Sequence, residues 1–220
     1  MVEPLGPYSD FGRLEVTPFV PRDARRVLDV GCLAGAFGAA LKSERPATTV
    51  WGIELRPDAA ELAAGRLDHV IVGRFPDDVP SGERFDCVVF NDVLEHLEDP
   101  WSALRATHAF LAPGGCVVAS IPNVRHYSVV ASLVLRGDWR YADAGILDRS
   151  HLRFFTSDSA TRLFEECGYG GVRCAPINIT PPRDRLPRLL HLAGRRGVDF
   201  LAYQLVLVAN TGAETGPAGK

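Results

Sequence analysis

The sequence predicts one α/β domain in which a mostly parallel sheet carries helices on both faces. Strand-like and helix-like segments alternate from residue 26 onward, which is typical of parallel strands joined by crossover helices. The mainly apolar run Phe85–Phe90 is what a strand covered on both faces requires. A chain of 220 residues is long enough for one such domain with a substantial core, and short for two.

The predicted elements follow one another closely in the first half of the chain. Arg26–Val30 is a short buried strand, and a glycine turn leads from it into a helix from Ala34 to Lys42. The elements that follow are strand Thr48–Glu54, a helix that begins at Pro57, strands His69–Val72 and Phe85–Phe90, a helix from Pro100 to Phe110, the turn Pro113–Gly115 and strand Cys116–Ile121. Proline suits the first turn of a helix, where no backbone N–H is needed. Ligands on sheets of this kind bind where the carboxyl ends of the strands meet.

The last third of the chain departs from this alternation. Its predicted elements are an amphipathic helix Tyr127–Arg136 that Gly137 ends, an irregular aromatic and charged segment 139–155, a helix from Thr156 to Cys167 that Gly168 stops, and strands Val172–Ile179 and Phe200–Asn210. Thr156 is a favourable N-cap, and glycine is the usual residue after a helix. The irregular segment is long for a plain connection. Residues 126–155 are therefore predicted to form an insert on the substrate side.

The domain itself is predicted to span residues 25–210. A proline-rich leader, 1–24, precedes it, with one helical turn expected around Gly12–Phe19, and a flexible tail, 211–220, follows it. Through Tyr8 and Arg13 the leader can fold over the site as a lid, or it can pack as an ordinary terminus.

Composition excludes several classes of function. The net charge of −3 gives no reason to expect a nucleic-acid partner, and no apolar run approaches the roughly 20 residues of a membrane helix. No secretory signal is visible at the amino terminus. The five cysteines are scattered and without a CxxC pair, which indicates reduced thiols in a cytoplasmic protein and no zinc site. Composition does not decide whether the protein forms a homodimer.

Three features at the carboxyl ends of predicted strands carry chemistry. The first is the glycine turn after Val30, where backbone N–H groups and a helix amino terminus can face a polar ligand. The second is Glu54, which ends the second strand about twenty residues after that turn and is placed to accept hydrogen bonds from ribose hydroxyls. The third is the segment Asn91–His96, in which Asp92, Glu95 and His96 share one face of a helical turn.

Together with Leu111–Gly115, these features resemble the class I S-adenosylmethionine-dependent methyltransferases, over about residues 25–125. Val27–Gly35 is similar to the family's first motif, Asp-x-Gly-x-Gly-x-Gly. The resemblance implies a Rossmann-like sheet of seven strands in the order 3-2-1-4-5-7-6, with the last strand antiparallel, and S-adenosyl-L-methionine as the cofactor. It implies that the cofactor-binding residues are Asp29, Gly31, Cys32, Leu33, Gly35, Glu54, Leu55, Asn91, Asp92, Val93 and, in the leader, Tyr8.

The sequence departs from the family pattern at two points. Leu33 stands where the motif has its central glycine, and Arg74 follows the third strand where the family often has an acid, for which Asp77 or Asp78 can substitute. A nicotinamide-dependent dehydrogenase is the nearest rival. It fits poorly, because Leu33 and Ala36 stand where the second and third glycines of its Gly-x-Gly-x-x-Gly pattern should be.

On the substrate side, Ile121–Ser128 and Ala144–Phe155 resemble small bacterial methyltransferases of polysaccharide and O-antigen synthesis. This implies a sugar or sugar-nucleotide acceptor with a hydroxyl or amine, which can also bear phosphate. The expected substrate-binding residues are Asn123, Arg125, Tyr127, Trp139, Tyr141, Arg149 and Arg153. The aromatic rings could stack on a sugar, and the arginines could bind phosphate or instead pair with aspartates of the loop. A methyltransferase of quinones, lipids or secondary metabolites, and a cofactor-binding module without catalysis, are the alternatives.

Methyl transfer to a hydroxyl is aided by a general base, and histidine titrates in the useful range. The candidates are His96, His126 and His151. No metal is predicted because the chain has no evident carboxylate trio, although Asp92 and Glu95 leave that option open.

Overall fold

Seven strands form one sheet in the order β3-β2-β1-β4-β5-β7-β6, as the family resemblance implies. The computed structural model describes residues 12–179 and 195–211. The strands are β1 (Arg26–Val30), β2 (Thr49–Glu54), β3 (His69–Val72), β4 (Phe85–Asn91), β5 (Leu111–Pro122), β6 (Tyr169–Ile179) and β7 (Ala202–Thr211). Strands β1 to β5 pair in parallel, and β7 is antiparallel to both β5 and β6. The predicted fold class and strand order are confirmed.

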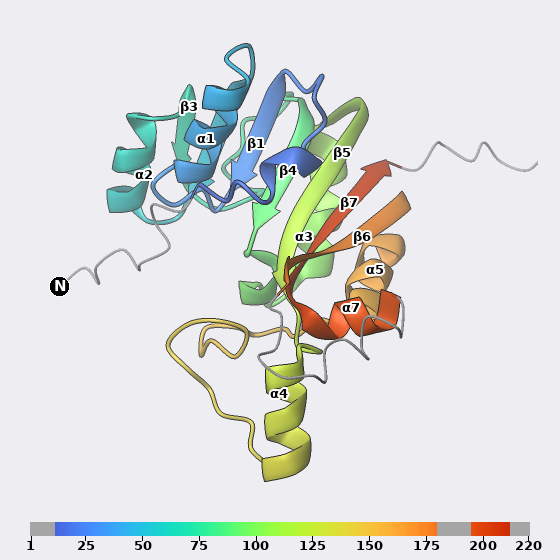
Figure 1. Cartoon of the computed structure of the whole chain (residues 1–220). Coiled ribbons are helices and arrows are strands. Elements are labelled where there is room, and N and C mark those ends of the chain that lie inside the picture. The colour runs from blue at the N-terminus through green and yellow to red at the C-terminus, as the bar shows by residue number, and fades with distance from the viewer. Residues whose placement is uncertain (1–11, 180–194, 212–220) are drawn as a thin grey trace, which may run out of the picture.

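Helices cover both faces of this sheet (Figure 1). They are α1 (Ala36–Glu44), α2 (Pro57–Ala64), α3 (Pro100–Thr107), α4 (Tyr127–Ala131), α5 (Ser157–Glu166) and α7 (Arg195–Leu201), with short 3₁₀ turns at Thr17–Phe19, Leu94–His96 and His108–Phe110. One apolar cluster joins β-strand side chains to α1 and α2, for example through Phe37 and Leu41. A second joins the other sheet face to α3 and α5, for example through Leu104 and Phe164. Two buried faces explain why the central strands are apolar on both sides.

Helix ends follow local chemistry. The Oγ1 atom of Thr156 accepts from the backbone N–H of Ser159 at 3.3 Å, and the Ser159 hydroxyl accepts from the Thr156 N–H at 2.9 Å. This capping box confirms the predicted start of α5. Gly137 and Gly168 have φ of 66° and 87°, the left-handed conformation of a residue that ends a helix.

Several boundaries differ from the sequence prediction. Helix α1 begins at Ala36 and not at Ala34, because Gly35 is still in the turn with φ of 76°. The predicted helix Tyr127–Arg136 is α helical only to Ala131 and continues as a π-helical turn. Phe200 belongs to α7, so the last strand begins at Ala202, and the predicted turn Pro113–Gly115 lies within β5.

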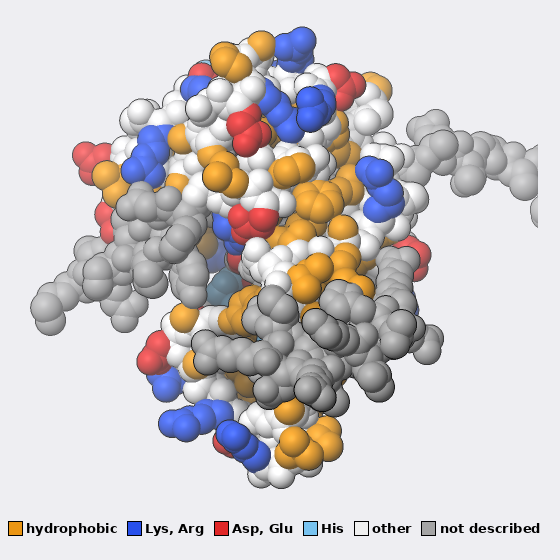
Figure 2. All heavy atoms as spheres, in the orientation of Figure 1, with side chains coloured by type: hydrophobic (Ala, Val, Ile, Leu, Met, Phe, Trp, Pro, Cys, Tyr) orange, Lys and Arg blue, Asp and Glu red, His pale blue; other side chains and the backbone are white. Residues whose placement is uncertain are grey.

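The predicted insert extends away from the sheet, with α4 and the following loop forming an arm (Figure 1). Apolar and basic side chains lie together at the end of this arm (Figure 2). Val134 and Leu135 at that end are 73% and 81% exposed. In the part of the chain that the structure describes, no helix combines the length and apolarity needed to cross a membrane.

Candidate functional site

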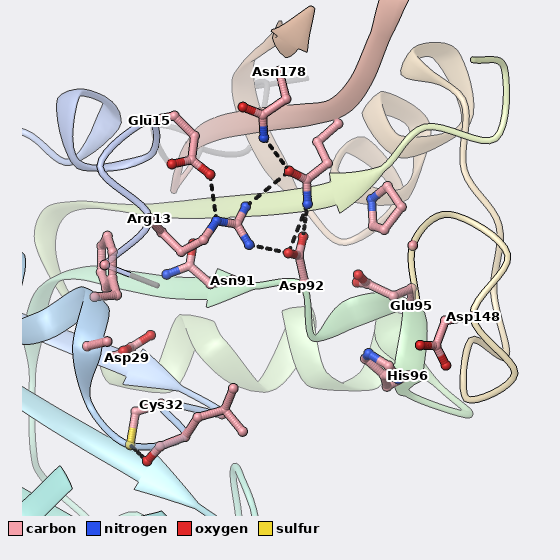
Figure 3. Close-up of a pocket in the computed structure, with 18 of the residues that line it drawn as sticks. Arg13, Glu15, Asp29, Cys32, Asn91, Asp92, Glu95, His96, Asp148 and Asn178 are labelled. Carbon is pink, nitrogen blue, oxygen red and sulfur yellow. Dashed lines mark hydrogen bonds and ion pairs between the residues drawn. The ribbon is translucent and has the colours of Figure 1, made fainter. Parts of the chain in front are cut away.

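A cavity of about 860 Å³ opens at the carboxyl ends of the parallel strands. The turn after β1 forms one part of its wall, and the segment after β4 together with the loop 145–151 forms another. Figure 3 shows Asp29 and Cys32 on one side of this space and Glu95, His96 and Asp148 on the other. Its volume lies within the usual range for small-molecule sites.

The turn after β1 is built from residues with left-handed backbone. Gly31, Leu33 and Gly35 have φ of 69°, 46° and 76°. The N–H of Gly31 donates to the carbonyl of Ile53 at 2.8 Å, which binds the turn to β2. A Cβ at Gly31 would lie 2.8 Å from a methyl of Val93, and one at Gly35 would lie 3.1 Å from the Cα of Ala63. Two of the three positions therefore require glycine for space as well as for conformation.

Leu33, the departure from the family motif, has the left-handed backbone conformation that glycine adopts most readily, with φ of 46°. Its N–H donates to Glu54 Oε2 at 3.0 Å. Its side chain is 39% exposed and lines the cavity. The leucine thus forms part of the cavity wall without displacing the turn.

Glu54 lies buried beneath this turn. Its Oε2 accepts from Leu33 and its Oε1 accepts from the N–H of Arg56 at 2.9 Å. Each carboxylate oxygen keeps a second lone pair, so the predicted ribose contact remains chemically available. Of the predicted cofactor residues, Gly35, Glu54, Leu55 and Val93 do not line the cavity wall, and Tyr8 lies outside the described residues.

Asp29 and Asn91 carry buried polar atoms that lack a close hydrogen-bond partner. Asp29 Oδ1 and both polar atoms of the Asn91 amide have no hydrogen-bond partner within the described ranges 12–179 and 195–211. Burial, and to a smaller extent the nearby Glu54 carboxylate, raises the pKa of Asp29 to about 8. Both residues line the cavity. Unpartnered buried groups of this kind are suited to a polar, positively charged ligand such as the methionine part of S-adenosylmethionine.

A polar network spans the middle of the cavity, with Arg13 between Glu15 and Asp92 (Figure 3). Arg13 pairs with the carboxylates of Asp92 and Glu15, and with the latter at 2.7 Å. Gln204 of β7 donates to both Asp92 oxygens at 2.9 Å. Arg13 belongs to the predicted leader that can fold over the site, but it is not among the predicted binding residues. Its position after Gly12 carries no motif that would have shown it.

Glu95, His96 and His151 come together at the far side of the cavity. Glu95 is 1% exposed, and burial, with the nearby Asp92 carboxylate, raises its pKa well above the usual value for a glutamate. The rings of His96 and His151 meet edge to face with centroids 4.7 Å apart. Burial and the neighbouring His151 lower the pKa of His96, so its imidazole is neutral at physiological pH.

The third predicted base, His126, does not line this cavity. It is buried, and its Nδ1 lies 2.8 Å from the Ser128 hydroxyl. Asn123, expected to bind substrate, instead joins the end of β5 to α7 and to the start of β7, because its amide donates to the carbonyls of Asp199 and Ala202 at 2.6 and 2.9 Å.

The other predicted substrate residues also have internal contacts and do not line the cavity. Arg125 lies 4.0 Å from the Asp199 carboxylate, and the Tyr127 ring packs against Phe200. Trp139 and Tyr141 pack on Phe154, with ring centroids 5.1 and 6.4 Å apart. Arg149 pairs with Asp143, and Arg153 donates to the carbonyl of Glu98. Arg149 therefore follows the alternative in which an arginine pairs with an aspartate of the loop.

Residues 12–173 match a protein family described as "Methyltransferase domain". Among curated proteins, the chain is 31% identical over 168 residues to a ubiquinone biosynthesis O-methyltransferase of Cereibacter sphaeroides, covering 73% of this chain and 66% of that protein. It is 34% identical over 155 residues to the protein of the same name in Ruegeria pomeroyi, covering 65% and 59%. The match thus spans less than two thirds of either relative's length.

Solved structures share the fold at low sequence identity. A SAM-dependent methyltransferase from Archaeoglobus fulgidus superposes with a TM-score of 0.63 at 18% identity, covering 90% of this chain and 91% of that one. The plantazolicin methyltransferase in complex with SAH has a TM-score of 0.60 at 14% identity, covering 86% and 76%.

Proposed function

Because the chain belongs to the S-adenosylmethionine-dependent methyltransferases, we propose that it methylates a hydroxyl on a small aromatic acceptor of the quinone-precursor type. Membership of the family makes the chain a methyltransferase domain with S-adenosyl-L-methionine as its cofactor. The acceptor is the proposal, and it rests on similarity to the ubiquinone biosynthesis O-methyltransferases.

One observation carries the proposal: a single cavity connects the unpartnered buried atoms of Asp29 and Asn91 to the cluster Glu95, His96 and His151. The first pair is suited to the methyl donor. The second group lines the same cavity, and we infer that the acceptor hydroxyl binds beside it. A phenolic hydroxyl, with a pKa near 10, loses its proton more readily than a sugar hydroxyl does, so an aromatic acceptor needs less help from a base.

The methyl donor supplies an electrophilic methyl group on a sulfonium. The acceptor oxygen would take this methyl group, the carbon–sulfur electron pair would leave with S-adenosylhomocysteine, and the hydroxyl proton would pass to a base such as the neutral imidazole of His96. The chain's own contribution is to hold the two reactants in line and to exclude water. Asp29, Asn91 and the backbone of Gly31 would bind the donor.

A saccharide acceptor, expected from the sequence, receives no support from the relatives, which are named for ubiquinone biosynthesis. Trp139 and Tyr141, expected to stack on a sugar, are packed on Phe154 within the insert. Arg149 and Arg153, which were expected to bind phosphate, each contact another part of the protein instead.

The test incubates the purified full chain with S-adenosylmethionine and a panel of dihydroxylated aromatic acids, prenylated phenols and sugar nucleotides. We expect methylated aromatic product by mass spectrometry, with stoichiometric release of S-adenosylhomocysteine. Methylation of the sugar nucleotides alone would contradict the aromatic proposal. Cofactor binding by calorimetry without turnover on any acceptor would instead favour the binding-module alternative.

A further inference from the structure

We propose that Cys87 and Cys116 are a redox-sensitive pair, which forms a reversible disulfide bond across the centre of the sheet when the protein meets a peroxide. All five cysteines are free thiols in the structure. Neither member of the pair lines the ligand cavity. Asn91, on the cavity wall, lies four residues beyond Cys87 on β4, which is about 13 Å along an extended strand. The inference therefore concerns a second site and does not depend on the acceptor.

The two cysteines lie directly opposite each other on neighbouring strands. Cys87 of β4 and Cys116 of β5 are register partners in the parallel pairing of these strands. Both side chains belong to the apolar cluster on the α1 side, so they point to the same face of the sheet. Neighbouring strands lie about 4.8 Å apart, and disulfides join residues whose Cα atoms lie about 4.4 to 6.8 Å apart. The backbone therefore holds the two residues within the range that a disulfide spans.

The two thiols also differ in reactivity. A hydrogen bond between them lowers the pKa of Cys116, and the same hydrogen bond, together with burial, raises the pKa of Cys87. The guanidinium of Arg173 lowers the pKa of Cys116 further. Because the thiolate is the nucleophilic form of cysteine, Cys116 is suited to react first and Cys87 is suited to resolve the product.

A bulge beside the pair provides access for a small oxidant. The register between β4 and β5 shifts immediately before the pair, and residues 112–115 of β5 form the irregular part. Pro113 and Gly114 within it are exposed, whereas Cys87 and Cys116 are only 0% and 2% exposed. Reaction therefore requires a local opening, and exposed, irregularly paired backbone is where such openings are least costly.

The reaction balances with one peroxide as the oxidant. The Cys116 thiolate attacks hydrogen peroxide, so that an S–O bond forms, the O–O bond breaks and the leaving hydroxide takes up a proton as water. The Cys87 thiol then loses its proton and attacks the sulfur of this sulfenic acid, so that the S–S bond forms, the S–O bond breaks and a second water leaves. Two thiols thus lose two electrons and two protons, and the peroxide becomes two water molecules.

The arrangement of the other cysteines makes this pairing selective. Cys167 and Cys174 belong to the cluster on the opposite face of the sheet. Cys32 lies in the turn beyond the end of β1, whereas the β1 residue opposite Cys87 is Val27, near the start of that strand. A bond from any of these three to the pair would require the strands to separate.

The test exposes the folded, freshly reduced full chain to hydrogen peroxide, blocks the remaining thiols with iodoacetamide and digests the protein with trypsin without reductant. Trypsin cuts after arginine, so residues 85–105 and 106–125 become separate peptides with one cysteine each, Cys87 and Cys116. We expect mass spectrometry to find these two peptides joined, and dithiothreitol added to the folded protein before digestion to separate them.

Three variants sharpen the test. Cys116→Ala should leave Cys87 free to react with iodoacetamide after peroxide treatment. Cys87→Ala should leave Cys116 without a resolving thiol, so that it accumulates as sulfenic or sulfinic acid. Cys167→Ala is the matched control, because it removes a buried cysteine whose thiol donates to the carbonyl of Trp101, and it should form the joined peptide as the wild type does.

Two results would overturn the proposal. One is a wild-type protein in which iodoacetamide blocks both cysteines after peroxide treatment, or in which the peptides join only after urea has unfolded the chain. The other is a bond from Cys116 to a cysteine other than Cys87. The measurement uses no acceptor and no methyl donor, so its outcome is separate from that of the proposed function.

Discussion

At the scale of single residues, the buried carboxyl of Asp29 makes cofactor binding depend on pH. Because its pKa is raised to about 8, the protein without ligand holds this group neutral at pH 7. A positively charged amine prefers the carboxylate, so binding must remove the proton. We expect affinity for S-adenosylmethionine to rise about tenfold per pH unit from pH 6 and to stop rising near pH 8.

Calorimetry at a series of pH values checks this, with Asp29→Asn as the control. The asparagine cannot ionise, so its affinity should be weak and nearly independent of pH over the same range. The stability of the free protein should run in the opposite direction: a carboxyl whose folded pKa lies above its unfolded pKa destabilises the fold as pH rises from about 4 to about 8. A wild-type affinity without pH dependence would contradict the role of Asp29.

Leu33 allows a second prediction at this scale. A non-glycine residue at φ of 46° costs about 1 to 2 kcal/mol. Leu33→Gly removes this cost but also the contacts of a partly buried side chain, so we expect stability to change by less than about 1 kcal/mol in urea unfolding.

Gly35→Ala is the contrasting variant, because its new Cβ would press on the backbone of Ala63 at a left-handed position. It should lose more than about 2 kcal/mol. Equal losses in the two variants would show that the Leu33 side chain itself holds the turn.

The sequence predicted the residues of this site that lie next to a strand end, but it did not predict Arg13. Asp29, Gly31 and Asn91 follow from the motif after a buried strand, because strand, turn and ligand face are neighbours in sequence. Arg13 reaches the cavity only through tertiary contacts, with Asp92 and with Ser120. Pairings between distant residues leave no local periodicity to detect.

At the scale of elements, Asn123 is expected to stabilise the sheet and not to bind substrate. Asn123→Ala would remove the two hydrogen bonds that its buried amide donates to the carbonyls of Asp199 and Ala202. We expect a loss of about 2 to 3 kcal/mol in thermal or urea unfolding. Affinity for S-adenosylmethionine should stay within twofold of the wild type.

Arg125→Ala is the matched control, since Arg125 is partly exposed and its pair with Asp199 spans 4.0 Å. It should cost less than about 1 kcal/mol. Should Asn123→Ala abolish methyl transfer at unchanged stability, the substrate role first expected for this residue would be restored.

Elements with strong local signals were predicted well, and those shaped by their neighbours were not. Thr156 and Ser159 fix the start of α5 through contacts three residues apart, so the cap was visible in the sequence. The start of α1 depends on Gly35, which is left-handed and packs closely against Ala63 of α2, and hydrophobic periodicity does not encode this contact.

At the scale of the whole molecule, cofactor binding should stabilise the fold. A ligand present at a hundred times its dissociation constant adds about 2.7 kcal/mol. For a domain of this size we expect the melting temperature to rise by about 5 to 10 °C in differential scanning fluorimetry. The Asp29→Asn variant should show a smaller rise at the same concentration, and no shift in the wild type would contradict cofactor binding at this cavity.

Strand order has a consequence for how the protein is made. Strand β7 is the last of the seven to be synthesised, yet it lies between β5 and β6, and its residue Gln204 contacts Asp92 at the centre of the cavity. During translation, β6 emerges from the ribosome before the strand with which it must pair. The sheet edge at β5 therefore stays open until synthesis has passed residue 211, and the ligand cavity can be completed only after that point.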